Sequence, residues 1–412
     1  MIQRNRRPVY SLIVANAVSL VGSSLTAVAI PWFVLETTGS AGKAGLSGAF
    51  AFLPAFFAGI FGGALVDRFG ARPSAMAADL VSGSAILMVP TLYHTVGLAF
   101  WQLLILVLIG SMLDIPGVTA RRAMLPELAE LGGVRLERVN AMLEGNWQIS
   151  ILLGPPVAGV LIGVMGAANV LWIDAASSLI SFTAILLLVP SNIHDHIRTA
   201  SQGYVQDLRI GLHFLWRDQV LRWISLMLAI SNAFGSPFYS LIIAVYIKER
   251  YDDPRYLGLL LSATGVGLLL GTTLYGSVGY RWSRAHIMRL AMILITLSYW
   301  PFGFQLPFPV LMAFVAIGGF VDGPLNPLLV TVRLERIPTE LRGRVFAATS
   351  AMAQMFPAFT IPLAGWMIER FDLTPTVFIL AAGAQIANLL MARLPVWDRL
   401  DETAHREVAV AA

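Results

Sequence analysis

The chain contains no cysteine, few charged residues and only two lysines. The absence of cysteine excludes disulfide bonds, thiolate catalysis and zinc–thiolate sites. Charged residues make up 13% of the 412 residues, whereas a soluble domain contains roughly 25%. Hydrophobic residues make up 57%, and they occur in blocks of about 20 or more, the length that a helix needs to cross a bilayer. The composition therefore predicts a polytopic membrane protein rather than a soluble helical protein with a large core.

Motifs for ATP-driven pumping and for catalysis are also missing. Lys43 and Lys248 do not follow the glycine spacing of a phosphate-binding loop, so a nucleotide domain would have to come from a separate subunit. No stretch resembles a channel filter. The six histidines lie in loops and at the ends of apolar segments, which provides no nucleophile–base or metal constellation. His194 and His196 could bind a metal but are more typical of a solvated turn. These absences favour a secondary carrier without a cofactor, driven by an ion gradient, over an enzyme, pump or channel.

Twelve apolar segments are predicted to be transmembrane helices, which makes the fold class all-α. They lie at about 9–35, 42–65, 74–96, 100–120, 143–165, 168–190, 219–247, 256–280, 286–304, 308–332, 345–369 and 374–394. The predicted domains are an N-terminal six-helix bundle (1–190), a cytoplasmic linker (191–218), a C-terminal six-helix bundle (219–394) and a cytoplasmic tail (395–412). The linker contains an amphipathic segment, 205–216, that we expect to lie along the cytoplasmic face of the membrane.

The distribution of positive charge predicts the orientation. With the N-terminus inside, the outer side holds few of the 28 basic residues, namely Lys43, Lys248, Arg250, Arg255 and Arg370. This bias agrees with the positive-inside rule and places both termini in the cytoplasm. The high pI, about 9.5, therefore reflects membrane topology and not a nucleic-acid partner.

The two halves of the chain repeat one another. Residues 109–116 align with 317–324, and 156–159 align with 362–365. Asp114 and Asp322 occupy the same position in the first pair, each two residues before a proline. The fourth predicted helix therefore corresponds to the tenth and the fifth to the eleventh, as in transporters built from parallel repeats.

A short charged turn joins the second and third predicted helices. Gly63 is followed by Asp67 and Arg68, then by Gly70 and Arg72. This spacing resembles the cytoplasmic signature between the second and third helices of the major facilitator superfamily, and it matches at every defining position. The resemblance implies two pseudo-symmetric six-helix bundles, a substrate bound between them near the bilayer midplane, and alternating access.

The resemblance also implies a gating role for this turn. In the family, the residue equivalent to Asp67 docks near the start of the eleventh helix when the cytoplasmic side is closed. Here the positive end of a helix dipole and two arginines would attract that carboxylate. The implied gating motif consists of Gly63, Asp67, Arg68, Gly70, Arg72, Arg342 and Arg344. The alternative is a positive-inside loop without a gating role. Tyr280 replaces the aspartate in the second half, which predicts an asymmetric gate.

The fifth predicted helix resembles, in part, the glycine–proline signature of proton-coupled exporters in the superfamily. The matching residues, a candidate hinge, are Gly154, Pro155, Pro156 and Gly159. Small residues allow close helix approach and prolines kink a helix. Ser150 and Ala158 stand where glycines are usual.

Further runs resemble the branch that contains macrolide-efflux and enterobactin-exporter-like carriers. They lie at 125–128, 140–141, 174–177 and 342–345. The resemblance implies proton-coupled antiport of a drug-like or siderophore-like molecule, and so multidrug resistance or siderophore export. A nutrient uptake carrier and a non-transporting sensor on the same fold are the alternatives.

Many exporters of the family carry an arginine inside the fourth helix. Arg121 and Arg122 are the first arginines here and are expected at its cytoplasmic end, so other groups would relay protons. The proton-coupling candidates are Asp114, Asp322 and Asp174, because a carboxylate at the bilayer centre costs about 2.5–3.5 kcal/mol and is retained for a reason. Asp114 and Asp322 could equally cap or pin helices broken by proline.

Polar and aromatic residues within the predicted helices are candidates for the substrate cavity. They are Asn16, Ser23, Glu144, Trp147, Gln148, Asn232, Tyr239, Asn326 and Gln354. The alternatives are interhelical hydrogen bonds and, for Glu144, snorkelling to the interface. The expected partners are the lipid bilayer, a small-molecule substrate and protons. We expect a monomer in a bacterial-type plasma membrane.

Overall fold

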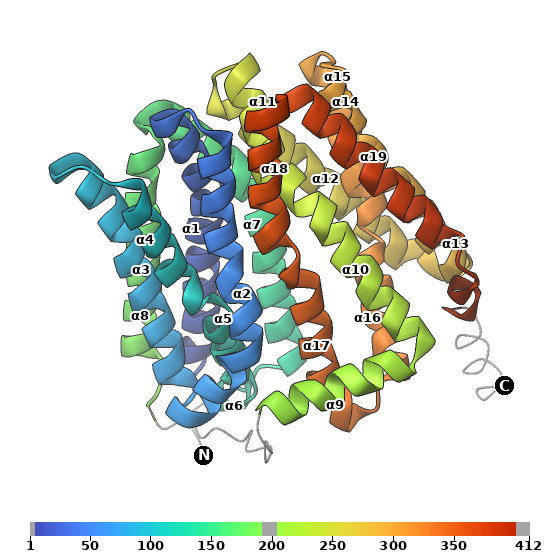
Figure 1. Cartoon of the computed structure of the whole chain (residues 1–412). Coiled ribbons are helices and arrows are strands. Elements are labelled where there is room, and N and C mark those ends of the chain that lie inside the picture. Colours follow the sequence, from blue (N-terminus) through green and yellow to red (C-terminus); the bar gives the residue numbers. More distant parts are fainter. Residues whose placement is uncertain (1–4, 192–203, 401–412) are drawn as a thin grey trace. The chain divides into compact units, whose positions relative to one another are not determined.

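A computed structural model describes residues 5–191 and 204–400, apart from the side chains of 55–65, 67, 204, 205, 207, 208 and 280. This part of the chain is helical and contains no strand (Figure 1). Eleven of its helical runs are long and apolar enough to cross a membrane, and α2 is a further helix of 29 residues. The all-α prediction is confirmed. His194, His196 and the end of the predicted tail, 401–412, lie outside the described residues.

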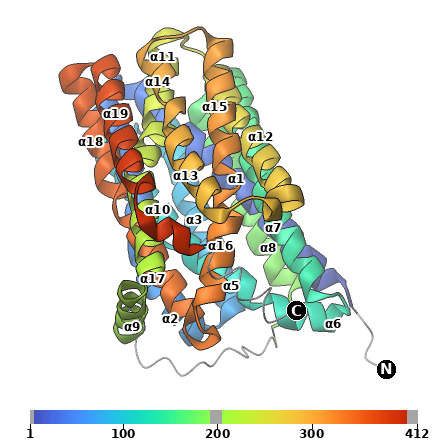
Figure 2. The ribbon, with the colours of Figure 1, turned by 90° about the vertical axis from the view of Figure 1, so that its right-hand side faces the viewer.

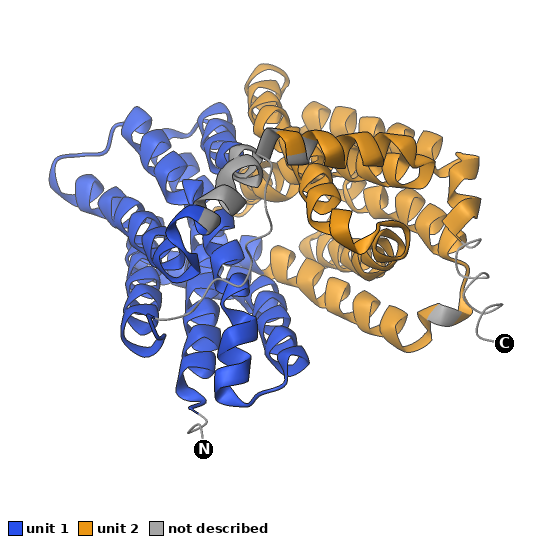
Figure 3. Ribbon diagram, turned by 90° about the horizontal axis from the view of Figure 1, so that it is seen from below, with its two compact units in different colours: residues 1–204, 253–258 blue, residues 205–252, 259–412 orange. Residues whose placement is uncertain are grey.

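The chain divides into two compact units, which Figure 3 colours separately. Unit 1 comprises residues 1–204 and 253–258, and unit 2 comprises 205–252 and 259–412. The helices of unit 1 are α1 (Arg7–Thr38), α2 (Ala41–Phe69), α3 (Ala71–Thr95), α4 (Phe100–Met112), α5 (Asp114–Ala123), α6 (Leu125–Gly132), α7 (Leu136–Met165) and α8 (Ala167–Leu188). Within this unit α1 packs against α7 and α8, and α3 packs against α5 and α8.

The remaining helices follow α8 along the chain, and their spans are more often interrupted. They are α9 (Tyr204–Arg217), α10 (Gln219–Pro237), the π-helix η1 (Phe238–Ile242), α11 (Ile243–Arg250), α12 (Pro254–Val278), η2 (Gly279–Arg281), α13 (Arg284–Ile295), η3 (Thr296–Ser298), α14 (Trp300–Gly303), α15 (Phe308–Asp322), α16 (Leu325–Arg336), η4 (Thr339–Leu341), α17 (Arg342–Met355), α18 (Pro357–Phe371), α19 (Leu373–Ala392) and η5 (Pro395–Asp398). In unit 2, α10 packs against α17, α18 and α19.

Prolines divide several segments that the sequence predicts as single helices. Pro116 has no N–H to bond to the carbonyl of Met112, and α4 ends at that residue. Pro324 interrupts the tenth predicted span in the same way, between α15 and α16. Asp114 is the first residue of α5 and Asp322 the last of α15. The two repeat-equivalent carboxylates therefore both lie at a helix break.

Polar side chains cap the starts of some of the helices. The hydroxyl of Ser40 accepts a hydrogen bond from the backbone N–H of Lys43, at 3.0 Å, at the start of α2. Asp218 accepts from the N–H groups of Val220 and Leu221, at 2.8 and 3.0 Å, at the start of α10. These caps satisfy N–H groups that a helix leaves without internal partners.

The amphipathic segment of the predicted linker forms α9, and part of its apolar face packs against protein. Leu215 has no exposed surface and joins Leu221, Ile337 and Val345 in one hydrophobic cluster. Gly211 packs against the backbone of Arg344 at the start of α17. Figure 1 draws α9 across the lower end of α17, and Figure 2 shows α9 nearly end-on next to α17. This helix is therefore attached to unit 2 in addition to any contact with the membrane.

Candidate functional site

A cavity of about 490 Å³ lies within unit 1, between side chains of α1, α3, α5, α7 and α8. It falls in the range of about 300–1,000 Å³ that is usual for small-molecule sites. Five sequence-predicted residues line it, namely Asn16, Ser23, Asp114, Glu144 and Trp147. The structure thus brings together substrate-cavity candidates from two helices and one proton-coupling candidate.

A second cavity of about 220 Å³ adjoins the first within unit 1. Its lining includes Asp114 and Asp174 and is otherwise made mostly of apolar side chains and hydroxyl groups from α1, α2, α3 and α4. Asp114, Ser23 and Ser82 line both cavities. Asp114 therefore lies between the two spaces, with its side chain open to them rather than packed in the core.

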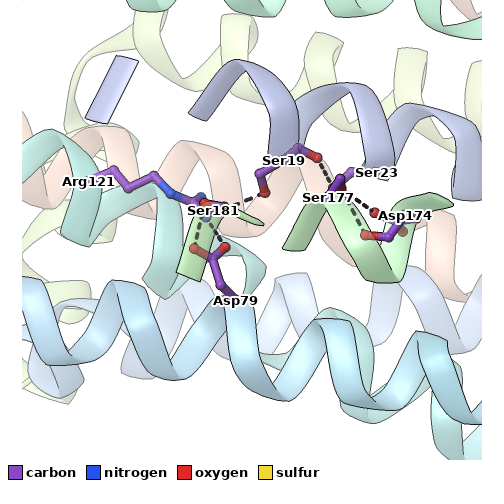
Figure 4. Close-up of polar contacts among 7 residues, drawn as sticks. All are labelled: Ser19, Ser23, Asp79, Arg121, Asp174, Ser177 and Ser181. Atoms are coloured by element: carbon purple, nitrogen blue, oxygen red, sulfur yellow. Dashed lines mark hydrogen bonds and ion pairs between the residues drawn. The ribbon is translucent and has the colours of Figure 1, made fainter. Parts of the chain in front are cut away.

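A buried ion pair in the larger cavity escaped the sequence analysis. Arg121 Nη2 contacts Asp79 Oδ1, and the two side chains are only 7% and 3% exposed. Ser181 Oγ donates to Asp79 Oδ2 at 2.7 Å, and Arg121 Nη2 donates to Ser19 Oγ at 3.4 Å (Figure 4). The network joins four helices, α1, α3, α5 and α8.

The expectation for Arg121 needs correction. The sequence placed it at the end of the fourth span with no relay role, whereas the structure buries it beside a carboxylate in the cavity. The reason is the helix break before Asp114, because α5 is a separate helix that packs against α3. The sequence does contain a feature that could have identified Asp79. It is an acidic residue inside an apolar span, where an unpaired charge costs free energy.

Asp174 lies at the interface of α8 with α1 and is 4% exposed. Thr26 Oγ1 donates to Asp174 Oδ2, and Ser177 Oγ lies 3.3 Å from Asp174 Oδ1 (Figure 4). The carboxylate is thus held by hydroxyl groups and faces no cation in these contacts. Thr26 was not among the residues predicted from the sequence.

An exposed ion pair also borders the larger cavity. Arg122 Nη2 donates to Glu144 Oε1 at 2.8 Å, and both side chains are 61% exposed. Such a pair contributes little to stability. Trp147, one helical turn farther along α7, is half exposed and lines the same cavity. Gln148 is half-buried and is not among the described side chains that line it.

In unit 2, Asp322 lies close to a group of aromatic residues. Its carboxylate interacts electrostatically with the hydroxyl groups of Tyr239 and Tyr299. The ring centroids of Tyr239 and Tyr299 are 6.3 Å apart, and those of Phe238 and Tyr299 are 4.2 Å apart with the rings tilted by 32°. Tyr239 belongs to the π-helix η1, a distortion that occurs frequently at functional sites. The structure thus brings together two candidates that are far apart in the sequence.

The other candidates in unit 2 stay separate. Asn232 Nδ2 donates to the carbonyl of Ala353 at 3.1 Å, which is an interhelical bond between α10 and α17. Asn326 is exposed on α16, and Gln354 is half-buried on α17. The geometry of Asn232 fits the alternative interpretation, a structural hydrogen bond.

The predicted gating turn is described in part. Gly63 and Asp67 belong to α2, and the side chain of Asp67 lies outside the described residues. Gly70 has φ 89° and separates α2 from α3, a conformation that favours glycine. Arg72 Nε and Nη2 donate to the carbonyls of Val189 and Leu186, at 3.0 and 2.7 Å, at the end of α8.

The remaining residues of the predicted gating motif differ in their contacts. Arg68 is exposed. Arg342 donates to the carbonyls of Leu334 and Ile337, at 3.0 and 3.2 Å, and so closes the end of α16. Arg344 is half-buried at the start of α17. A cation at the C-terminal end of a helix is stabilised by the helix dipole, which accounts for Arg72 and Arg342.

The candidate hinge lies inside one continuous helix. Pro155 and Pro156 are both within α7, and the helix is not interrupted there. Gly154 and Gly159 are buried. A methyl group on Gly154 would overlap the Ser24 side chain of α1. Gly154 therefore allows close packing of α7 against α1, and Gly159 allows close approach to Pro254 and Gly258 of α12.

Three carboxylates line the larger cavity of unit 1, and two of them are paired with an arginine. Asp79 is paired with Arg121, and Glu144 is paired with Arg122. Asp114 makes no side-chain hydrogen bond or ion pair with the residues that the structure describes. An unpaired carboxylate in a water-accessible cavity can bind a proton or a cationic group.

Comparison with known proteins identifies the family. The family model described as the Major Facilitator Superfamily matches residues 12–252 and 226–408. The multidrug efflux pump Tap of Mycobacterium tuberculosis is 31% identical over 405 residues, which cover 97% of this chain and 96% of that protein. Macrolide efflux protein A of Streptococcus pyogenes is 22% identical over 363 residues, 88% of this chain and 89% of that protein.

A solved structure of the nucleoside transporter NupG has the same fold. It superposes with a TM-score of 0.75 at 13% identity, covering 94% of this chain and 99% of that chain. The helical architecture, the repeated broken helix and these matches agree, and the chain is a membrane transporter of the Major Facilitator Superfamily.

Proposed function

We propose that this transporter exports a drug-like small molecule in exchange for protons. The observation that carries the proposal is the unpaired carboxylate of Asp114, which lies between the two cavities of unit 1. The names of two similar proteins, a multidrug efflux pump and a macrolide efflux protein, support export as the direction. A siderophore-like molecule is the second substrate class that the sequence resemblance implies.

In this proposal the larger cavity accepts part of the substrate. Asn16, Ser23 and Glu144 offer polar groups, and Trp147 offers an aromatic face. Asp114 exchanges its proton for substrate, because a carboxylate that serves both cavities can respond to either occupant. Asp174 in the smaller cavity and Asp322 in unit 2 are further proton-coupling candidates.

The orientation is also part of the proposal. The positive-inside rule favours cytoplasmic N- and C-termini. The turn around Asp67 would then lie on the cytoplasmic side, where the family resemblance implies that it gates. A plasma-membrane location and a monomeric state complete the proposed arrangement.

The test uses purified protein in liposomes that contain a pH-sensitive dye. A panel of macrolides, other drugs and siderophores is added, and the substrate-dependent proton flux is recorded. We expect proton movement opposite to substrate movement. Accumulation of substrate together with protons would overturn export in favour of uptake. Silence across the panel, with folded protein, would overturn proton-coupled efflux of these substrate classes.

The residue-level test replaces Asp114 with asparagine. We expect Asp114→Asn to lose proton-driven transport by at least tenfold while keeping substrate counterflow, which needs binding and alternation but no net proton movement. Asp322→Asn is the repeat-matched comparison and shows whether the second unit also carries a proton. An equal loss of counterflow and of proton-driven transport in Asp114→Asn would instead indicate a structural role for this residue.

A further inference from the structure

Two charged residues of α5 and the glycine between them lie on one face of the helix. Asp114, Gly117 and Arg121 are spaced three and four residues apart, so they lie above one another. All three line the larger cavity. Side chains of a helix lean toward its N-terminus, which directs Arg121 toward Asp114.

Gly117 leaves the space between the two charged residues without a side chain. A methyl group placed there would lie 2.8 Å from Ala78 Cβ and 3.8 Å from Arg121 Nη1. The absence of that methyl group lets α5 pack closely on α3. It also keeps the helix surface between Arg121 and Asp114 clear.

The guanidinium group of Arg121 has donors that its known contacts do not use. Nη2 binds Asp79 and Ser19. Nε is buried and has no hydrogen-bond partner among the described residues. A buried donor without an acceptor is unfavourable, so this N–H is available for an acceptor that comes within reach. The side chain of Arg121 is 7% exposed and its residue lines the cavity.

By comparison, both carboxylate oxygens of Asp79 already accept a hydrogen bond. One of its carboxylate oxygens accepts from Arg121 and the other accepts from Ser181. The guanidinium group therefore has an unused hydrogen-bond donor, whereas each carboxylate oxygen of Asp79 already has a partner. One cation therefore interacts electrostatically with two carboxylates, Asp79 and Asp114, and is hydrogen-bonded to the first alone among the described residues.

The charged groups that face Asp114 come from three elements. Asp79 on α3, Arg121 on α5 and Asp174 on α8 all interact with it electrostatically. Arg122 and Glu144, at the same cavity, are paired with each other. The described lining residues of α1, α2 and α4 offer neutral groups only. Arg121 is thus the cation positioned to compensate Asp114.

We propose that Arg121 is shared between Asp79 and Asp114 and compensates the negative charge left when Asp114 releases its proton. When Asp114 carries a proton, the guanidinium stays on Asp79. When the proton leaves to cavity water, the Arg121 guanidinium, whose Nη1 lies beside the space over Gly117, turns an unused N–H toward the new carboxylate. No covalent bond changes at Arg121, which acts as a positioning residue. This inference rests on the proposed function, in which Asp114 is the proton carrier.

The test reads the protonation of Asp114 directly and needs no substrate. A hydrophobic carbodiimide reacts with a protonated carboxyl group, and mass spectrometry of the peptide that contains Asp114 measures the modified fraction. The experiment follows this fraction against pH in the reconstituted full chain. We expect Arg121→Gln to move the pH of half-modification upward by about one unit, a tenfold change in proton affinity, because the compensating cation is lost.

The matched variant changes Asp79, the other member of the ion pair. It is expected to shift the pH of half-modification in the opposite direction. Asp79→Asn removes a negative charge and frees Arg121, so the pH of half-modification should fall. Arg121→Lys keeps the charge and should stay near the wild-type value. Shifts of the same sign in Arg121→Gln and Asp79→Asn would overturn the proposal, as would no shift in either, because a purely structural ion pair predicts similar damage from both ends.

Two outcomes separate this inference from the transport proposal. Opposite shifts without substrate-driven proton flux in the wild type would refute proton-coupled export and leave the shared arginine intact. Proton flux in the wild type without opposite shifts would refute the sharing of Arg121. If Arg121→Gln fails to insert into membranes, Asp79→Asn still tests the proposal, and an unchanged or higher half-modification pH in that variant overturns it.

Discussion

Individual polar side chains of unit 1 divide into compensated and uncompensated groups. Asp79 has a guanidinium and a hydroxyl as partners, whereas Asp174 has hydroxyl groups alone. Removing one partner of a buried ion pair is costly because the other charge stays behind in a low-dielectric environment. The Asp79 network therefore stabilises the packing of α3, α5 and α8, and it also holds Arg121 in the cavity.

The hydroxyl of Ser181 offers a stability test at this scale. Ser181→Ala leaves Asp79 Oδ2 without its donor at 2.7 Å, and an unsatisfied buried acceptor costs about 1–3 kcal/mol. We expect a lower midpoint of thermal unfolding in detergent. The control is Thr183→Ala on the same helix, because Thr183 is exposed and bonds only to its own helix at Leu179. Equal midpoints for the two variants would contradict the stabilising role of Ser181.

Two kinds of element-level feature position the residues discussed above, namely helix breaks near prolines and the packing of the linker helix α9. The breaks before α5 and α16 place Asp114 and Asp322 at helix ends, where free backbone N–H and C=O groups add to the local polarity. In unit 2, α9 packs against α17 through Gly211 and Leu215. The helix that follows, α10, is fixed at its start because Asp218 pairs with Arg336 of α16 at 3.3 Å.

Gly211 provides the test of this attachment. In Gly211→Leu the new side chain would meet the Arg344 backbone, whose carbonyl carbon lies only 2.8 Å from the position of a Cβ. Overpacking of this kind costs about 1–3 kcal/mol. We expect a lower unfolding midpoint and faster proteolysis near residue 204.

The matched control for Gly211→Leu is Gly343→Ala in α17. A Cβ at position 343 has no neighbour within 4 Å, and alanine is a better helix former than glycine. This variant should keep or slightly raise the midpoint. If Gly211→Leu leaves both stability and proteolysis unchanged, α9 does not depend on its contact with α17.

At the scale of the whole molecule, two units carry the same broken helix in different surroundings. In unit 1 the carboxylate at the break faces charged groups and two cavities. In unit 2 the equivalent carboxylate interacts electrostatically with two tyrosines, one of which belongs to a π-helix. The internal repeat therefore conserves the backbone feature between the halves, whereas the chemistry around it differs.

The predicted gating turn is tested on the whole transporter. We expect Asp67→Asn to abolish transport in the liposome assay while membrane insertion and the unfolding midpoint stay at wild-type values, because the family resemblance implies that its charge acts during alternation. Glu130→Gln removes an exposed carboxylate from α6 and should leave transport unchanged. Full activity of Asp67→Asn would remove the gating role.

The sequence alone determined the class of this protein. Hydrophobic block length and the positive-inside bias predicted an all-α polytopic membrane protein because each reflects a requirement of the bilayer that acts locally along the chain. The internal repeat predicted two similar halves, as in transporters built from parallel repeats. The spacing from Gly63 to Arg72 indicated the superfamily, and the family match confirms it. Asn16, Ser23, Asp114, Glu144 and Trp147 were also identified as single candidates before their common cavity was visible.

Tertiary structure decided which polar groups belong together. Arg121 looked like a positive charge at the end of a span, but the break at Asp114 and the close approach of α3 bury it against Asp79. The partnership of Thr26 with Asp174 likewise depends on two helices that are far apart in sequence. Hydropathy and spacing describe one helix at a time, whereas an ion pair or a cavity depends on the packing between helices, and that packing is set by the whole bundle.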